Sequence, residues 1–113
     1  MIEQVHPRDL TTWLESARAR GTPCVLDVRE PWEWQTASVS PDGFELLTVP
    51  MRTVPVRLAE LDPTRPIACL CHHGGRSMQV AAFLKQHGFE QVANIAGGID
   101  AWSRERDPAI PRY

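Results

Sequence analysis

The chain has 113 residues, of which 42% are hydrophobic and 23% are charged, and its formal net charge is −2. This length and composition predict one ordinary globular domain, and the near-neutral charge disfavours a nucleic-acid partner. No apolar stretch is long enough to span a bilayer, so we also expect no membrane partner. We therefore predict a single domain over residues 1–113.

The cellular location is predicted from the N-terminus and the cysteines. The first residues, MIEQVHPRDL, are neither basic nor apolar, which disfavours a signal peptide and predicts a cytoplasmic protein. Thiols stay reduced in that compartment, and the odd number of three cysteines also disfavours a disulfide framework.

The N-terminal region predicts an amphipathic helix over residues 7–20. Pro7 suits the first turn of this helix, and Gly21 suits the position just after its end. Four apolar residues share one helical face, namely Leu10, Trp13, Leu14 and Ala17. A short strand is predicted before this helix at residues 3–5, and a buried strand follows it at residues 24–28.

The rest of the chain alternates between strands and helices. Further strands are predicted at residues 46–49, 66–71 and 92–95, and helices at residues 32–34, 54–61, 77–87 and 99–106. Most of residues 36–50 is expected to form a loop, because serine, proline and glycine gather there. This alternation, with strands that are apolar on both faces, predicts an α/β sandwich around a mainly parallel sheet.

The segment ACLCHHGGRS, residues 68–77, leads from a predicted strand into a predicted helix. Ligand sites in parallel sheets lie at such strand-to-helix turns. Gly74 and Gly75 let the backbone curl tightly, and a curled loop before a helix gathers N–H groups into an anion-binding hollow. We expect Cys71 at the rim or floor of this hollow, where the amides and Arg76 favour the nucleophilic thiolate.

Three segments together resemble the single-domain rhodanese-like sulfurtransferases. The segment CHHGGRS at residues 71–77 is similar to the active-site loop of that family, Cys-x-x-Gly-x-Arg-Ser. LDVREPWEW at residues 26–34 resembles the early "DVRE" motif, and NIAGGIDAW at residues 94–102 resembles the late "L-x-GG-x-x-AW" motif. The resemblance spans about residue 4 to residue 104 and implies a three-layer sandwich with about five strands and helices on both faces.

The resemblance also implies a function and a set of site residues. The chain would take a sulfane sulfur from thiosulfate or a persulfide donor, hold it as a persulfide, and pass it to a thiol or protein-cysteine acceptor. No cofactor and no metal are expected. The implied residues are Cys71 as the nucleophile; His72, His73, Gly74, Gly75, Arg76 and Ser77 as the substrate-binding loop; and Asp27 and Arg29 as loop support.

Two alternatives to this function are open. Four residues separate Cys71 from Arg76, as in rhodanese-like loops, whereas the related phosphatases have five, so arsenate or phosphate chemistry ranks lower. The other alternative is a non-catalytic rhodanese-fold module that binds a partner or carries sulfur. The intact cysteine, glycines and arginine of the loop favour the enzyme.

The remaining cysteines, histidines and tryptophans have less specific predictions. Cys24 and Cys69 are expected in the core, with Cys69 on the same strand face as Cys71. A zinc site is disfavoured, because no second pair of ligands is evident. We expect the loop histidines to point their side chains toward solvent. Trp13 and Trp102 are expected in the core, while Trp32 and Trp34 either pack the early loop or line the mouth of the pocket.

Overall fold

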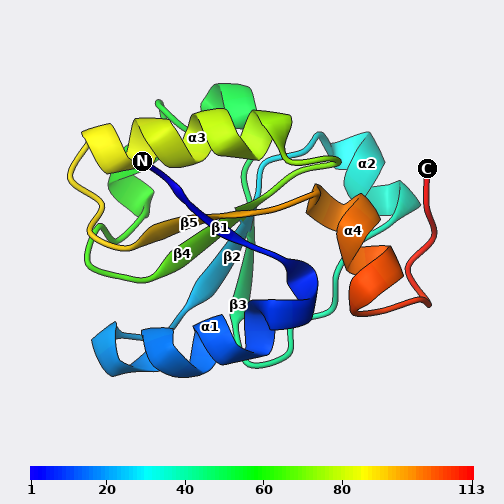
Figure 1. Cartoon of the computed structure of the whole chain (residues 1–113). Coiled ribbons are helices and arrows are strands. Elements are labelled where there is room, and N and C mark those ends of the chain that lie inside the picture. The colour runs from blue at the N-terminus through cyan, green and yellow to red at the C-terminus, as the bar shows by residue number, and fades with distance from the viewer.

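A five-stranded parallel sheet forms the centre of the molecule (Figure 1). The structure, a computed structural model, describes residues 1–113. The strands are β1 (Glu3–Val5), β2 (Cys24–Asp27), β3 (Glu45–Thr48), β4 (Ile67–Leu70) and β5 (Val92–Ile95), in the order β1-β5-β4-β2-β3. Every pair of neighbours is parallel. The predicted parallel sheet is therefore confirmed, with strand ends that differ from the predicted ones by one residue at most.

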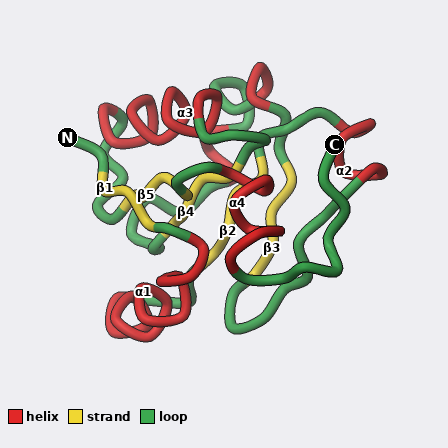
Figure 2. Tube along the Cα trace, turned by 45° about the vertical axis from the view of Figure 1, so that its right-hand side comes forward, coloured by secondary structure: helices red, strands yellow, loops and turns green.

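Helices cover both faces of the sheet, which gives the three predicted layers (Figures 1 and 2). They are α1 (Leu10–Ala17), α2 (Pro31–Thr36), α3 (Gly75–Gln86) and α4 (Gly98–Glu105). α1 and α4 pack on one face, and α3 packs on the other. The predicted helix over residues 7–20 is α1 with a 3-10 turn at either end. None of the helices has the length and apolar content needed to cross a membrane.

The two faces of β4 bury different residues. Ala68 and Leu70 belong to the core beneath α1 and α4, whereas Ile67 and Cys69 belong to the core beneath α3. Cys71 continues the second set, which confirms that it shares a face with Cys69. Each large apolar side chain in these cores stabilises the fold by about 1.5–3 kcal/mol relative to exposure.

The predicted core residues are buried as expected. Trp13 and Trp102 lie beneath α1 and α4, and Cys24 and Cys69 lie beneath α3. Burial raises the pKa of the Cys24 thiol to about 11, and it also raises the pKa of the Cys69 thiol. A thiol that stays protonated is a poor nucleophile, so these two cysteines serve the core.

The helix predicted over residues 54–61 is wrong. This region contains only a 3-10 turn at Leu58–Glu60, and a separate 3-10 turn, Met51–Thr53, comes directly before it. Pro55 offers no backbone N–H, and Pro63 disfavours the helical conformation of the residue before it. The few residues between them are too short a stretch to offset the cost of starting a helix. The segment still contributes Val54 and Leu61 to the core beneath α3.

Candidate active site

Three strand-to-helix connections meet at the carboxyl edge of the sheet. They lead from β4 to α3, from β2 to α2 and from β5 to α4. The start of α4 holds the first of these connections directly, because Ile99 N–H donates to Cys71 O at 2.9 Å and Asp100 N–H donates to His72 O at 3.1 Å. Gly98 has φ +62°, and a Cβ there would collide with both carbonyl oxygens. Gly98, the second glycine of the Gly97–Gly98 pair, is therefore required for this close approach.

The sulfur of Cys71 lies at the start of α3. Its Sγ accepts a hydrogen bond from Gly74 N–H at 3.1 Å and lies 3.2 Å from Ser77 Oγ. The residue is only 1% exposed, so the sulfur is at the floor of the loop. The first-turn N–H groups of a helix have no intrahelical partners and attract negative charge. The sulfur therefore lies where hydrogen-bond donors converge.

Helix α3 begins two residues before the predicted start at Ser77. Gly74 adopts the left-handed conformation, with φ +106°, and turns the chain so that the helix starts at Gly75. Ser77 consequently lies in the first turn, buried, and its hydroxyl donates to Asn94 Oδ1 of β5 at 2.6 Å. A serine hydroxyl has one proton, so it donates either to Asn94 or to the Cys71 sulfur. The Ser77 proton is thus available to the sulfur when the sulfur carries negative charge.

Arg76 is one half of an ion pair. Its guanidinium donates to Glu33 of α2 in the bidentate way, with Nη1 at 2.7 Å from Oε2 and Nη2 at 2.9 Å from Oε1. The Arg76 side chain is 36% exposed, whereas that of Glu33 is 3% exposed. The Arg76 hydrogen bonds lower the pKa of Glu33 to about 2, and Glu33 in turn raises the pKa of Arg76. Arg76 therefore adds a fixed donor group to the loop, but its charge is partly neutralised.

Asp27 and Arg29 form a fully buried ion pair at the end of β2, with Arg29 Nη2 at 2.7 Å from Asp27 Oδ2. The Arg29 guanidinium also donates to the carbonyl oxygens of Glu33, within α2, and of Ala37, directly after α2, and to Tyr113 Oη. Buried charges are tolerated only when they are paired and hydrogen-bonded in this way. The loop support expected of this pair is thus indirect: Arg29 holds α2, and α2 presents Glu33 to Arg76.

The two histidines of the loop have different surroundings. His73 is exposed, as expected, but the expectation for His72 is wrong, because its ring is half-buried between two other rings. It stacks on His73 at 3.8 Å and on Tyr113 at 3.9 Å between ring centroids. Desolvation, followed by the nearby His73, lowers the pKa of His72, so this imidazole is neutral at pH 7. Stacking therefore shields the His72 ring from water, although the sequence predicts a ring in solvent.

The surface beside the loop is hollowed. A cavity of about 390 Å³ is lined by Glu30, Met51, Arg52 and Arg76. Trp32 is 61% exposed at this edge of the molecule, and its ring meets Tyr113 edge to face at 6.1 Å. Trp34 is half-buried instead, with an indole N–H that has no hydrogen-bond partner. Neither tryptophan lines this cavity; Trp34 fits packing of the early loop, and Trp32 packs on Tyr113.

Three residues at this site were not singled out from the sequence. Glu33 follows Glu30 at the spacing of a capping box, and the structure has both hydrogen bonds of that box. Asn94 is a polar residue in an otherwise apolar strand, which is a weak signal for a buried partner. Tyr113 carries no local signal, because only the folded chain brings it to the loop.

Comparisons with known proteins agree with this geometry. The sequence model of the Rhodanese-like domain family matches residues 10–105. A protein named sulfurtransferase from Allochromatium vinosum is 36% identical over 86 residues, which is 76% of this chain and 77% of that protein. The crystal structure of a rhodanese-related protein from Thermoplasma volcanium superimposes with a TM-score of 0.77 at 26% identity, covering 98% of this chain and 99% of that one.

Other relatives contain this domain within a much longer chain. The rhodanese-like/PpiC domain-containing protein 12, chloroplastic, of Arabidopsis thaliana is 44% identical over 79% of this chain, which is 30% of that protein. The probable adenylyltransferase/sulfurtransferase MoeZ of Mycobacterium tuberculosis is 32% identical over 96% of this chain, which is 26% of that protein. The chain thus spans less than a third of these two relatives, and it belongs to the rhodanese-like domain family, which includes sulfurtransferases.

Proposed function

We propose that the protein transfers a sulfane sulfur through a persulfide on Cys71. The observation that supports this most is the position of the Cys71 sulfur. It lies at the first turn of α3, within hydrogen-bond distance of the Gly74 N–H and the Ser77 hydroxyl. These donors meet a charged sulfur without any rearrangement of the backbone, which is the way that enzymes stabilise developing negative charge.

In the proposed first step, the Cys71 thiolate attacks the outer sulfur of thiosulfate. A new S–S bond forms on Cys71, the S–S bond of thiosulfate breaks, and sulfite leaves with the electron pair. In the second step an acceptor thiolate attacks the outer sulfur of the persulfide. The acceptor then carries the sulfur, and the Cys71 thiolate is restored, so that no external oxidant or reductant is needed.

The surroundings of the loop are compatible with an anionic donor and a thiol acceptor. The hollow beside the loop presents Arg52 and the exposed part of Arg76. Thiosulfate and small persulfides are anions, so these groups favour their approach. The cytoplasmic location is part of the proposal, because the reaction needs a reduced Cys71 and all three cysteines are free thiols. The proposed chemistry uses no cofactor.

The test is intact-protein mass spectrometry after incubation with thiosulfate and then with a low-molecular-mass thiol. We expect a gain of one sulfur mass, located on Cys71 by peptide mapping, and its loss after the thiol is added. Cys71→Ala should abolish this gain while the protein stays folded. Cys69→Ala is the matched control, because it removes a buried cysteine from the same strand, and it should load sulfur like the wild type.

Two other results would contradict the proposal. Sulfur gain that persists in Cys71→Ala would mean that another group carries the sulfur. No gain with thiosulfate or with glutathione persulfide, together with no alkylation of Cys71 by iodoacetamide, would favour the non-catalytic interaction module.

A further inference from the structure

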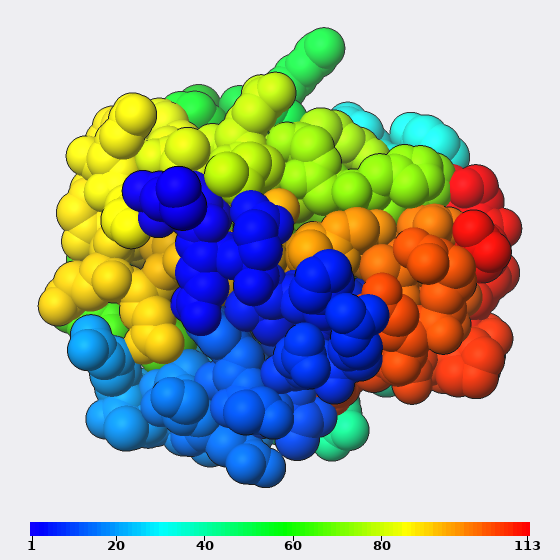
Figure 3. Space-filling model, in the orientation of Figure 1, coloured from blue at the N-terminus to red at the C-terminus, as the bar shows by residue number.

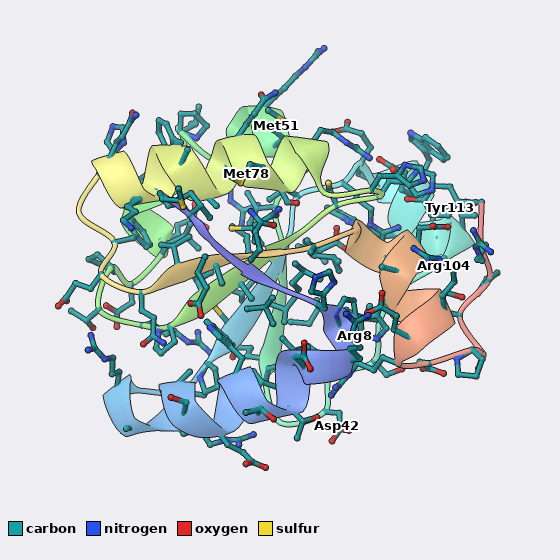
Figure 4. The ribbon with its side chains drawn as sticks, in the orientation of Figure 1. Arg8, Asp42, Met51, Met78, Arg104 and Tyr113 are labelled. Carbon is teal, nitrogen blue, oxygen red and sulfur yellow. The ribbon has the colours of Figure 1, made fainter.

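The side chain of Tyr113 lies against the Cys71 loop, although it is far from the loop in the sequence. Both ribbon views place the C-terminus next to α2 (Figures 1 and 2). Figure 4 labels Tyr113 beside α2 and the start of α4. This residue lies outside the stretch matched by the family, residues 10–105. The family match therefore does not describe its contacts.

The ring of Tyr113 is one end of an aromatic stack with the two loop histidines. It lies nearly parallel to the ring of His72, at 9° and with centroids 3.9 Å apart, and Trp32 meets its edge. His73 extends the stack on the other side of His72. Without the Tyr113 ring, one face of His72 would be open to water, and the loop would lose a rigid wall. The ring thus holds the first residue after Cys71.

The hydroxyl of Tyr113 joins the two ion pairs of the site. It accepts a hydrogen bond from Arg29 Nη1 at 2.9 Å and donates one to Glu33 Oε1 at 2.8 Å. Glu33 is the carboxylate that holds Arg76. Burial and the hydrogen bond to Glu33 raise the pKa of Tyr113 to about 12, although the hydrogen bond from Arg29 acts in the opposite direction, so the donor proton is present at neutral pH. One side chain therefore links the buried Arg29 to the loop arginine.

The segment before Tyr113 is itself anchored. Ile110 is buried beneath α1 and α4, and its carbonyl accepts a hydrogen bond from the buried Ser103 hydroxyl at 2.6 Å. Arg112 Nε donates to Asp100 Oδ1 of α4 at 2.9 Å. In the space-filling view the last residues pack along α4 without a gap (Figure 3). The chain up to Arg112 is thus anchored on α4 independently of the contacts that Tyr113 makes with the loop.

We propose that Tyr113 is a positioning residue for the Cys71 loop, with its ring fixing His72 and its hydroxyl fixing the Glu33–Arg76 pair. This inference rests on the proposed sulfur transfer, because it assigns a part in that reaction to a residue that does not touch the sulfur. The loop carries its donors on the backbone, so a small displacement of His72 or Arg76 displaces the anion-binding groups. Misplacement of this kind slows a reaction strongly.

The test compares Tyr113→Phe with Tyr113→Ala in the full chain. Phe keeps the ring and loses only the hydroxyl, while Glu33 and Arg29 each retain other partners. We expect the rate of sulfur loading from thiosulfate to fall about threefold in Tyr113→Phe and about tenfold or more in Tyr113→Ala. Val56→Ala, at an exposed position outside the loop, should load at the wild-type rate.

A second measurement needs no sulfur donor. The ring protons of His72 are followed by NMR as the pH is lowered in the wild type and both variants. The groups around this ring are His73, Tyr113, Glu33 and Arg76, and desolvation is the main cause that lowers its pKa. Tyr113→Ala should therefore shift the His72 titration to higher pH, toward that of an ordinary histidine, whereas Tyr113→Phe should leave it in place.

The outcomes separate this inference from the proposed function. A folded Tyr113→Ala variant that loads sulfur within twofold of the wild type overturns the role of Tyr113. The role is also overturned if Tyr113→Ala and Tyr113→Phe load sulfur equally slowly and the His72 titration does not move in Tyr113→Ala. That pattern would indicate a general structural defect. If the wild type takes up no sulfur, the proposed function fails, and the His72 titration alone then decides whether Tyr113 holds the loop.

Discussion

The inner and outer sides of the Cys71 loop are held in different ways. On the inner side, Cys71 is held by Gly74 and Ser77, within six residues of chain, together with backbone N–H groups at the start of α4. On the outer side, Arg76 is held by Glu33, 43 residues away. The inner contacts use backbone and small polar groups, whereas the outer contacts use long charged and aromatic side chains.

This difference indicates how the two sides would tolerate change. The inner side depends on backbone positions that only glycine allows, so substitutions there would destabilise it through steric clashes. The outer side depends on buried charges, which are costly when one partner is lost and neutral or better when both are replaced by apolar residues. Substitutions that act on one side at a time therefore test the comparison.

The largest effect is expected at the buried Asp27–Arg29 pair, which supports the outer side through α2. Asp27→Ala leaves the fully buried Arg29 without its carboxylate, and we expect a loss of about 3–5 kcal/mol in the free energy of unfolding. Urea unfolding measures this loss. The double variant Asp27→Leu with Arg29→Met should be more stable than Asp27→Ala. A double variant that is as unstable as the single one would mean that packing, and not the unpaired charge, is responsible.

The next effect is expected on the inner side. Gly98→Ala places a Cβ against the carbonyl oxygens of Cys71 and His72 at a positive φ, and we expect a loss of about 3 kcal/mol. Gly75→Ala is the matched control, because its Cβ would meet nothing within 4 Å and its φ is not positive. The control should be neutral or stabilising by up to about 1 kcal/mol. Thermal unfolding of both variants measures the difference, and equal losses would refute the steric explanation.

The smallest effect is expected at the Glu33–Arg76 pair. Glu33→Gln should cost about 1–2 kcal/mol at pH 7, a value reduced for solvent screening because Arg76 is 36% exposed. The pKa of Glu33 is lowered from 4.5 to about 2 in the folded protein. The stabilisation is therefore complete above about pH 4.5 and is lost as the pH falls toward 2.

Unfolding of the wild type and Glu33→Gln at a series of pH values measures this dependence. The two proteins should differ most near neutral pH and converge as the pH falls toward 2. A difference that stays constant over this range would show that the Glu33 charge is not what stabilises the loop.

Much of the inner side was predictable from the sequence. The strand at residues 92–95 and the loop after Cys71 follow from local patterns, because apolar runs form buried strands and paired glycines allow tight turns. The outer side was less predictable from the sequence. The buried Asp27–Arg29 pair was expected near the loop, but its support acts through α2, and Glu33 was not singled out.

The sequence by itself determined the alternation of strands and helices, the parallel sheet, and the placement of CHHGGRS at its carboxyl edge. These features depend on hydrophobic period and on backbone freedom, which are properties of residues close in the chain. Only the tertiary structure decided that Glu33 pairs with Arg76 and that Tyr113 stacks on His72. Those contacts join residues that are distant in the chain, and no local preference of either partner specifies the other.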